Sequence, residues 1–165
     1  MPAGIKALAE ATNLSEVKVC RHQGVEGDIV AAGPGVQTTI FTVANGAVNV
    51  LLIFGHVTVV IAGAATPLLN FTPNVNATLV PIATVHVSIG GDAIDSIQHW
   101  NGTVADALVQ STSLGICGTA ELAWAGGLLL PPGIVTVGNA GAVATGVMDW
   151  YCAYVPSELG AKVLP

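Results

Sequence analysis

The stretch TTIFTVANGAVNVLLIFGHVTVVIAG, residues Thr38–Gly63, decides the fold because it is apolar, rich in β-branched residues and free of Lys, Arg, Asp and Glu. The pair Asn45-Gly46 divides it, and Asn-Gly accepts the positive φ of a type I′ turn between antiparallel strands. We therefore predict a hairpin. Its first arm is Thr38–Val43 and its second arm is a long strand, Val48–Ile61.

The second arm is apolar on both faces. Side chains alternate along a strand, so we expect two sets of apolar residues, one on each face. The first set is Val48, Val50, Leu52 and Phe54, and the second is Leu51, Ile53, Val57 and Val59. A small domain has one core, so the second face should meet another layer or another subunit. We expect Gly55 to mark a bulge or a close backbone approach.

A membrane-spanning helix is the alternative interpretation of this segment. Ala47–Ala65 is uncharged and long enough to cross a bilayer of about 30 Å. Val, Ile and Thr dominate it, however, and they favour a strand. Asn49 and His56 would also be unfavourable in lipid, so we expect no membrane partner.

Composition indicates a single domain that associates with other subunits. The 165 residues are 52% hydrophobic and only 8% charged, against about 25% charged in an average soluble domain. Such a surface would be poorly solvated in a monomer, so we predict a homo-oligomer, most simply a trimer. The net charge of −6, with four Lys and Arg, argues against a nucleic-acid partner.

Charge is concentrated at the start of the chain, where half of the charged residues lie within the first 28 positions. We predict that residues 1–35 form an N-terminal arm that lies on a neighbour, with a short strand-like pattern at Glu16–Arg21. Residues 36–165 are then the β domain.

Short β-rich runs separated by Pro and Gly fill the rest of the chain. They predict an all-β fold, a jelly-roll-like β-sandwich or barrel. We expect the polar stretch Asp92–Ser113 to be an exposed loop excursion with short helical turns. The predicted strands after the hairpin are Leu68–Thr72, Ala77–Val80, Ile82–Ile89, Leu114–Cys117, Ala120–Trp124, Leu128–Leu130, Ile134–Gly138 and Gly146–Val155.

One cluster has residue types that would suit a cation or a sugar: Asp92, Asp95, His99 and Asp106, with Trp100 nearby. Its spacing matches no EF-hand and no glycosidase pattern. Phosphate loops, nucleophile elbows and metalloprotease helices are absent from the sequence. We therefore predict no catalytic, cofactor-binding or metal residues and no enzyme activity.

The other His and Cys residues are also expected to have structural roles. Cys20-Arg21-His22 would be half a metal site, but no second pair at ligand spacing exists. His56 and His86 both lie in β-rich runs and would face each other across a sheet. The three cysteines, Cys20, Cys117 and Cys152, are expected to be buried free thiols in a reducing compartment.

The last predicted strand carries an aromatic pair. Trp150 and Tyr154 stand at even spacing with Met148 and Cys152, so these side chains share one face. We predict that Trp150 is a core anchor. The residues predicted to be core or interface are Val50, Leu52, Phe54, His56, Trp150 and Tyr154.

The run LLLPPGIVTVGNAGAVATGVMDWYCAYVPSELGAKV, residues Leu128–Val163, is the most specific part of the sequence. With the earlier run FTVANGAVNVLLIFGHVT, it resembles a family of small virion proteins of tailed bacteriophages. The pieces that carry the resemblance follow one another in the family's order: Pro132-Gly133, Thr145-Gly146, Trp150, Tyr154, Pro156 and Gly160-Ala161-Val163.

The resemblance implies a capsid decoration or cement protein that binds the major capsid protein between neighbouring subunits. It implies a place on the capsid exterior after synthesis in the bacterial host cytoplasm. A tail or spike component is one alternative. A carbohydrate-binding β-sandwich that uses Asp92–Trp100 is the other.

Overall fold

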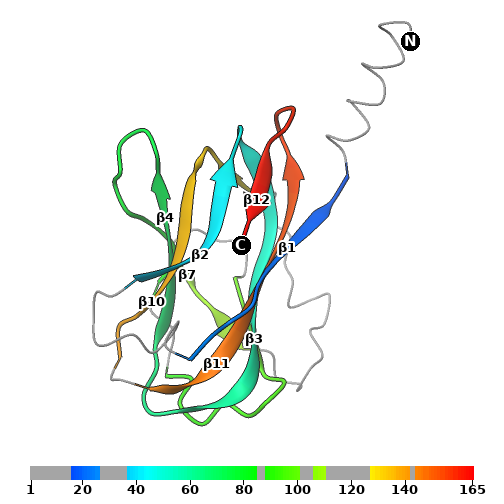
Figure 1. Cartoon of the computed structure of the whole chain (residues 1–165). Coiled ribbons are helices and arrows are strands. Elements are labelled where there is room, and N and C mark those ends of the chain that lie inside the picture. The colour runs from blue at the N-terminus through cyan, green and yellow to red at the C-terminus, as the bar shows by residue number, and fades with distance from the viewer. Residues whose placement is uncertain (1–15, 27–36, 85–87, 101–105, 111–126, 142–143) are drawn as a thin grey trace, which may run out of the picture.

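The structure is a computed structural model that describes residues 16–26, 37–84, 88–100, 106–110, 127–141 and 144–165. Every regular element among these residues is a strand, and the strands form two sheets that pack as an open β-sandwich (Figure 1). The predicted all-β class is therefore confirmed, as a sandwich and not as a closed barrel.

Strands that are far apart in the sequence lie side by side in both sheets. All pairings are antiparallel except that of β5 with β7, which is parallel. Sheet A runs in the order β1 (Lys18–His22), β11 (Thr145–Pro156), β3 (Val48–Ala62), β6 (Ile97–His99) and β8 (Val109–Gln110), and β9 (Leu128–Leu130) also pairs with β3. Sheet B runs in the order β12 (Lys162–Leu164), β2 (Gln37–Ala44), β10 (Gly133–Asn139), β4 (Pro67–Pro73), β5 (Val80–Thr84) and β7 (Asp106–Ala107).

The Asn45-Gly46 turn exists, but it does not join a hairpin. Both residues have positive φ, 61° and 129°. The strands on either side enter different layers, because β2 pairs with β10 and β12 in sheet B while β3 pairs with β11, β6 and β9 in sheet A. The hairpin prediction is wrong. Positive φ reverses the chain locally, whereas the pairing partner of each strand is set by contacts with distant parts of the sequence.

The segment that would have suited a membrane helix is a strand. Val48–Ala62 forms β3, so the helical alternative for Ala47–Ala65 is wrong. Across the ranges that the structure describes, no helix is long and apolar enough to span a bilayer.

β3 carries an extra residue that changes which side chains share a face. Its register with β11 pairs Leu52 with Ala153 and Val50 with Tyr154, so Leu51 is left over as a bulge. After the bulge the odd-numbered Ile53 points into the core. The predicted assignment of one face to Val50, Leu52 and Phe54 is therefore wrong.

The residues predicted to be core or interface divide between two places. Val50, Trp150 and Tyr154 lie in the core. Leu52, Phe54 and His56 are half-buried on the outer face of sheet A.

Gly55 is a point of close approach. It lies opposite Trp150 on the neighbouring strand, and a Cβ there would be 2.6 Å from Cε of Met148 and 3.1 Å from Cζ3 of Trp150. The register shifts between β3 and β11 lie elsewhere. Of the two roles expected for Gly55, the structure shows the close approach, which leaves room for the indole.

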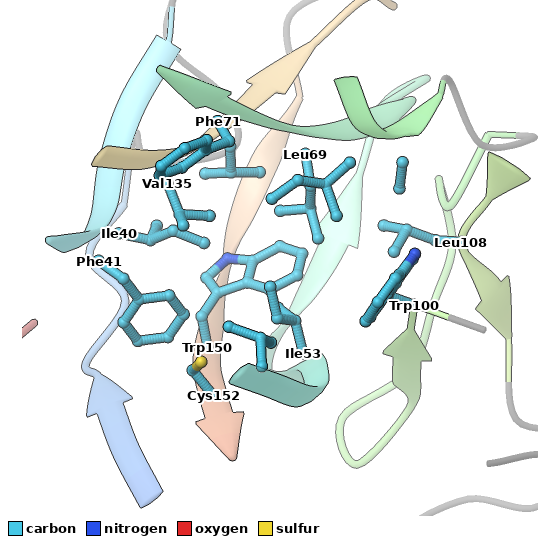
Figure 2. Packing of buried hydrophobic residues seen from close by; sticks show 14 of the residues in the cluster. Ile40, Phe41, Ile53, Leu69, Phe71, Trp100, Leu108, Val135, Trp150 and Cys152 are labelled. Carbon is cyan, nitrogen blue, oxygen red and sulfur yellow. The ribbon is translucent and has the colours of Figure 1, made fainter. Parts of the chain in front are cut away.

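Trp150 stands at the centre of the core between the two sheets (Figure 2). It is fully buried, and Met148, Cys152 and Tyr154 on the same face of β11 are buried too, as the even spacing predicted. The surrounding side chains come from both layers and include Ile40, Phe41, Ile53, Leu69 and Val135. The indole Nε1 has no hydrogen-bond partner among the described residues, so Trp150 contributes through packing.

Part of the predicted loop excursion Asp92–Ser113 enters the sandwich. Ile97–His99 is β6, and the amide of Trp100 donates to the carbonyl of Ile53 at 2.9 Å. Gln98, His99 and Trp100 are buried, so the prediction of an exposed loop with helical turns is wrong for this part. The strands predicted at Leu114–Cys117 and Ala120–Trp124 lie outside the described residues.

The described part of the predicted arm belongs to the sandwich. Lys18–His22 is β1, the edge strand of sheet A, and Cys20 on it reaches the core. For these residues the interpretation as an arm lying on a neighbour does not apply. Residues 1–15 and 27–36 lie outside the described ranges, and the boundary at Gly35 and the jelly-roll connectivity stay predictions.

Replacing Trp150 by Ala should lower the free energy of unfolding by about 3 to 5 kcal/mol, because it leaves a cavity between the sheets. Trp150→Phe should cost less, since it keeps one ring and removes an N–H that has no partner. Urea unfolding followed by circular dichroism measures both. Val75→Ala, at a side chain that is 91% exposed, is the control and should stay within about 0.5 kcal/mol; a similar value for Trp150→Ala would contradict the core assignment.

Candidate interaction surface

The described members of the acidic and imidazole cluster differ in burial and in their partners. Trp100 and His99 are buried, so Trp100 presents no ring on which a sugar could stack. Asp95 instead contacts His56, and Asp92 accepts from Nε2 of Gln98 at 2.7 Å. The side chain of Asp106 lies outside the described part of the structure. Among the described side chains, no group of three His, Cys, Asp or Glu residues is placed to hold a metal ion.

The sequence Cys20-Arg21-His22 divides between the two sides of sheet A. Cys20 points into the core and Arg21 points outward, as neighbours on a strand must. Arginine is not a metal ligand, and His22 lies on the same side of β1 as Cys20. Among the described side chains, however, no further His, Cys, Asp or Glu is grouped with these two to hold a metal ion. The proposed partner of His56 across the sheet, His86, lies outside the described residues.

Apolar and aromatic side chains from four strands meet on the outer face of sheet A. The register puts Val19, Ala153 and Leu52 in one row across β1, β11 and β3, and puts Tyr151 and Phe54 in the next row. Leu129 of β9 joins them beside the start of β3. We call this set the apolar face; it consists of Val19, Leu52, Phe54, Leu129, Tyr151 and Ala153.

The most protruding members of the apolar face lie at its two sides. Val19 is 66% exposed and Leu129 is 63% exposed. In the row beyond Val19, on the side away from Leu129, the rings of Phe54 and Tyr151 stack, with centroids 4.7 Å apart and planes 9° apart. Arg21 lies over Tyr151, with its guanidinium carbon 5.8 Å from the ring centroid. The face therefore combines an ordered aromatic pair with two exposed aliphatic side chains on the same side of the sheet.

Charged side chains and an imidazole border the apolar face on sheet A. Arg21 Nη2 donates to Oδ2 of Asp149 at 2.5 Å, and the amide of Gly24 donates to Oδ1 of the same carboxylate at 2.8 Å. His56 lies opposite Asp149 on β3, and its Nε2 is 2.9 Å from Oδ1 of Asp95. This border ties β1, β11, β3 and the turn before β6 together on one surface.

Asp149 is held as a carboxylate by this border. Burial by itself raises its pKa, but the hydrogen bonds from Arg21 and Gly24 and the charges of Arg21 and His56 outweigh burial and lower the pKa below its usual value. Gly24 also has to be Gly, because a Cβ there would lie 2.1 Å from the backbone oxygen of Met148. The carboxylate thus fixes the chain that follows β1.

The outer face of sheet B carries a polar cluster that is bonded to itself, beside half-buried Ile134 and Leu68. Gln37 Oε1 accepts from Nδ2 of Asn70 at 3.1 Å and also from the hydroxyl of Thr136. Thr42 and Thr72 flank β10 on the same side. Of the two outer faces, sheet A therefore presents the surface that gains more from burial.

Sequence reasoning found Leu52, Phe54 and His56 but not the surface that they build. The alternation rule placed Leu52 and Phe54 with Val50, because the bulge at Leu51 leaves no mark in the pattern. Arg21 and Asp149 were missed as partners since they stand 128 positions apart. The alternation that places Trp150 and Cys152 on one face of β11 puts Tyr151 and Ala153 on the other, and it was the signal available for the outer face.

Comparison of the chain with protein-family models, with curated proteins and with solved structures gives no significant match.

The pH dependence of stability should contain a contribution from Asp149. Its pKa is lower in the folded state than in the unfolded chain, where it is about 3.9. The contribution is therefore present above that pH and is lost as the pH falls through the folded pKa. Asp149→Asn should remove this part of the acid limb when urea midpoints are measured from neutral pH to about pH 3.

Arg21→Gln is the matched variant for this measurement. It should reduce the same acid dependence only in part, because the amide of Gly24 still donates to the carboxylate. An acid limb of unchanged slope in Asp149→Asn would contradict the assignment.

Proposed function

We propose that the protein is a structural virion protein that decorates a bacteriophage capsid and stabilises it by binding between neighbouring capsid subunits. The observation that carries the proposal is the apolar face, where exposed Val19 and Leu129 lie on the same side of sheet A as stacked Phe54 and Tyr151. Interface cores have this character, with aromatic anchors inside a polar rim. The resemblance of Leu128–Val163 to small virion proteins supplies the kind of partner.

Binding through buried area agrees with the rest of the surface. Only 8% of the residues are charged, and the polar border of Arg21, Asp149, His56 and Asp95 satisfies its charges within the chain. A capsid subunit would therefore cover apolar side chains without having to neutralise unpaired charges beside them. The activity proposed is cohesion between subunits, without catalysis.

The partners in this proposal are the major capsid protein and further copies of the chain. Stable interfaces use about 20 to 30 residues from each side, so the apolar face would be the centre of a larger contact. The proposed place is the exterior of the capsid, after synthesis in the host cytoplasm. A position in a tail or spike would use the same face and would be recognised by where labelled protein lies on the particle.

Introducing charge on the apolar face should abolish capsid binding without unfolding the domain. Val19→Glu and Leu129→Glu change exposed side chains, so melting followed by circular dichroism should change little. Binding to particles that lack the protein should weaken at least about tenfold, since an unpaired carboxylate would be buried in the contact. Co-sedimentation with such particles measures the loss.

The chain offers matched controls for this experiment. Val75 and Leu159 are 91% and 61% exposed and lie in the turns after β4 and β11. Val75→Glu and Leu159→Glu should bind particles as the unchanged protein does. Equal binding by all four variants would refute the role of the apolar face.

Purified protein should sediment as an oligomer, most simply a trimer, at micromolar concentration, because the chain has so few charges to solvate a monomer. Val19→Glu should leave that oligomer intact, since the apolar face is assigned to the capsid. A folded monomer in sedimentation velocity would contradict the oligomer. Dissociation caused by Val19→Glu alone would reassign the face to contacts between copies.

A further inference from the structure

Two buried cysteines face each other across sheet A. Cys20 of β1 and Cys152 of β11 are direct partners in the antiparallel register. Both side chains point into the core, where Cys20 is 8% exposed and Cys152 is 1% exposed, and both are free thiols. Figure 2 shows Cys152 beside Trp150.

The register places this pair within reach of a disulfide. Directly opposed residues of an antiparallel pair have Cα atoms about 5.5 Å apart when they exchange hydrogen bonds and about 4.5 Å apart when they do not. A disulfide accepts Cα separations of about 4.4 to 6.8 Å. The Cβ atoms of opposed residues are about 4.5 to 5.5 Å apart and a disulfide needs about 3.5 to 4.5 Å, so β1 has to shift by up to about 1 to 2 Å for the sulfur atoms to bond.

We propose that Cys20 and Cys152 are a disulfide-forming pair that a low-molecular-weight disulfide, such as glutathione disulfide, oxidises to a covalent staple between β1 and β11. The thiolate of Cys20 attacks one sulfur of the oxidant, which leaves a mixed disulfide and releases one small thiol. The thiolate of Cys152 then attacks the sulfur of Cys20 and releases the second small thiol. The two protein thiols lose two protons and two electrons, and the oxidant is reduced to two thiols.

Burial makes this reaction depend on opening of the edge strand. Removal from water raises the pKa of both thiols, so the attacking thiolate is scarce while β1 is paired. β1 is only five residues long and lies at the end of sheet A, where local opening costs least. Opening exposes Cys20 first, and return of β1 to its register brings the mixed disulfide onto Cys152.

The staple would act directly on the apolar face. Val19 and Arg21 flank Cys20 on β1, so a bond at Cys20 fixes one side of that face and of its charged border. The setting of the reaction rests on the proposed function. A virion protein is made in reducing cytoplasm and then released into an oxidising medium, so the bond would form after release.

The test uses the full-length chain with Cys117→Ser, so that no third thiol competes. After incubation with glutathione disulfide, peptide mass spectrometry should find one intramolecular Cys20–Cys152 bridge and the loss of both thiols together. Hydrogen exchange of the β1 amides, Lys18–His22, should slow at least about tenfold compared with the reduced protein. Cys20→Val and Cys152→Ala keep an apolar side chain in the core and should show no such slowing.

Three results would overturn the pair: a stable mixed disulfide at Cys20, a bridge between two chains, or thiols unchanged under saturating oxidant. Peptide mapping of the chain with Cys117 retained distinguishes the same three results if Cys117→Ser does not fold. A separate experiment tests where the bond forms. Thiols are alkylated at the moment when the protein is collected from infected cells and from released particles. A bridge present only in particles supports the setting, whereas absence of the protein from particles overturns the proposed function and not the pair.

Discussion

The pairing of β3 with β11 is the constraint on which the sandwich depends. These are the two longest strands, and together they form the middle of sheet A. Their inner side holds Trp150 over Gly55, where any larger residue would meet the indole or Met148. Their outer side stacks Phe54 on Tyr151. One register therefore fixes both the centre of the core and the centre of the apolar face, and a slip would break both.

Several strands could be predicted because their signals are local, although the predicted strand Ala77–Val80 has strand structure only at Val80. Leu128–Leu130 has the predicted bounds, and Gly146–Val155 and Leu68–Thr72 each differ from the observed strand by one residue at either end. Even spacing of large residues was also enough to place Trp150 inside. Side-chain alternation over a few residues carries this information whatever the rest of the chain does.

The errors arose where distant contacts decide the outcome. Asn45-Gly46 reverses the chain but cannot choose between a hairpin and a step to the other sheet. The bulge at Leu51 exists because β11 has one residue fewer over the same span, which is visible only once the partner is known. Polar Gln98 and His99 suggested a loop, although their neighbour Trp100 completes the core beside Ile53. The candidate surface could not be predicted for the same reason, because each of its rows of side chains runs across strands that are far apart in the sequence.

The position of β11 in the chain has a consequence for biosynthesis. Lys18 pairs with Tyr154 and Phe54 with Tyr151, so during synthesis β1 and β3 stay without this partner until a segment far along the chain has been made. Folds dominated by such distant pairings form slowly, and their unpaired strand edges are prone to aggregate in the meantime. The apolar face cannot form before β11 has been made, since its middle strand is missing until then. Association through that face is avoided up to that point, and any assembly that uses it begins only after β3 and β11 have paired.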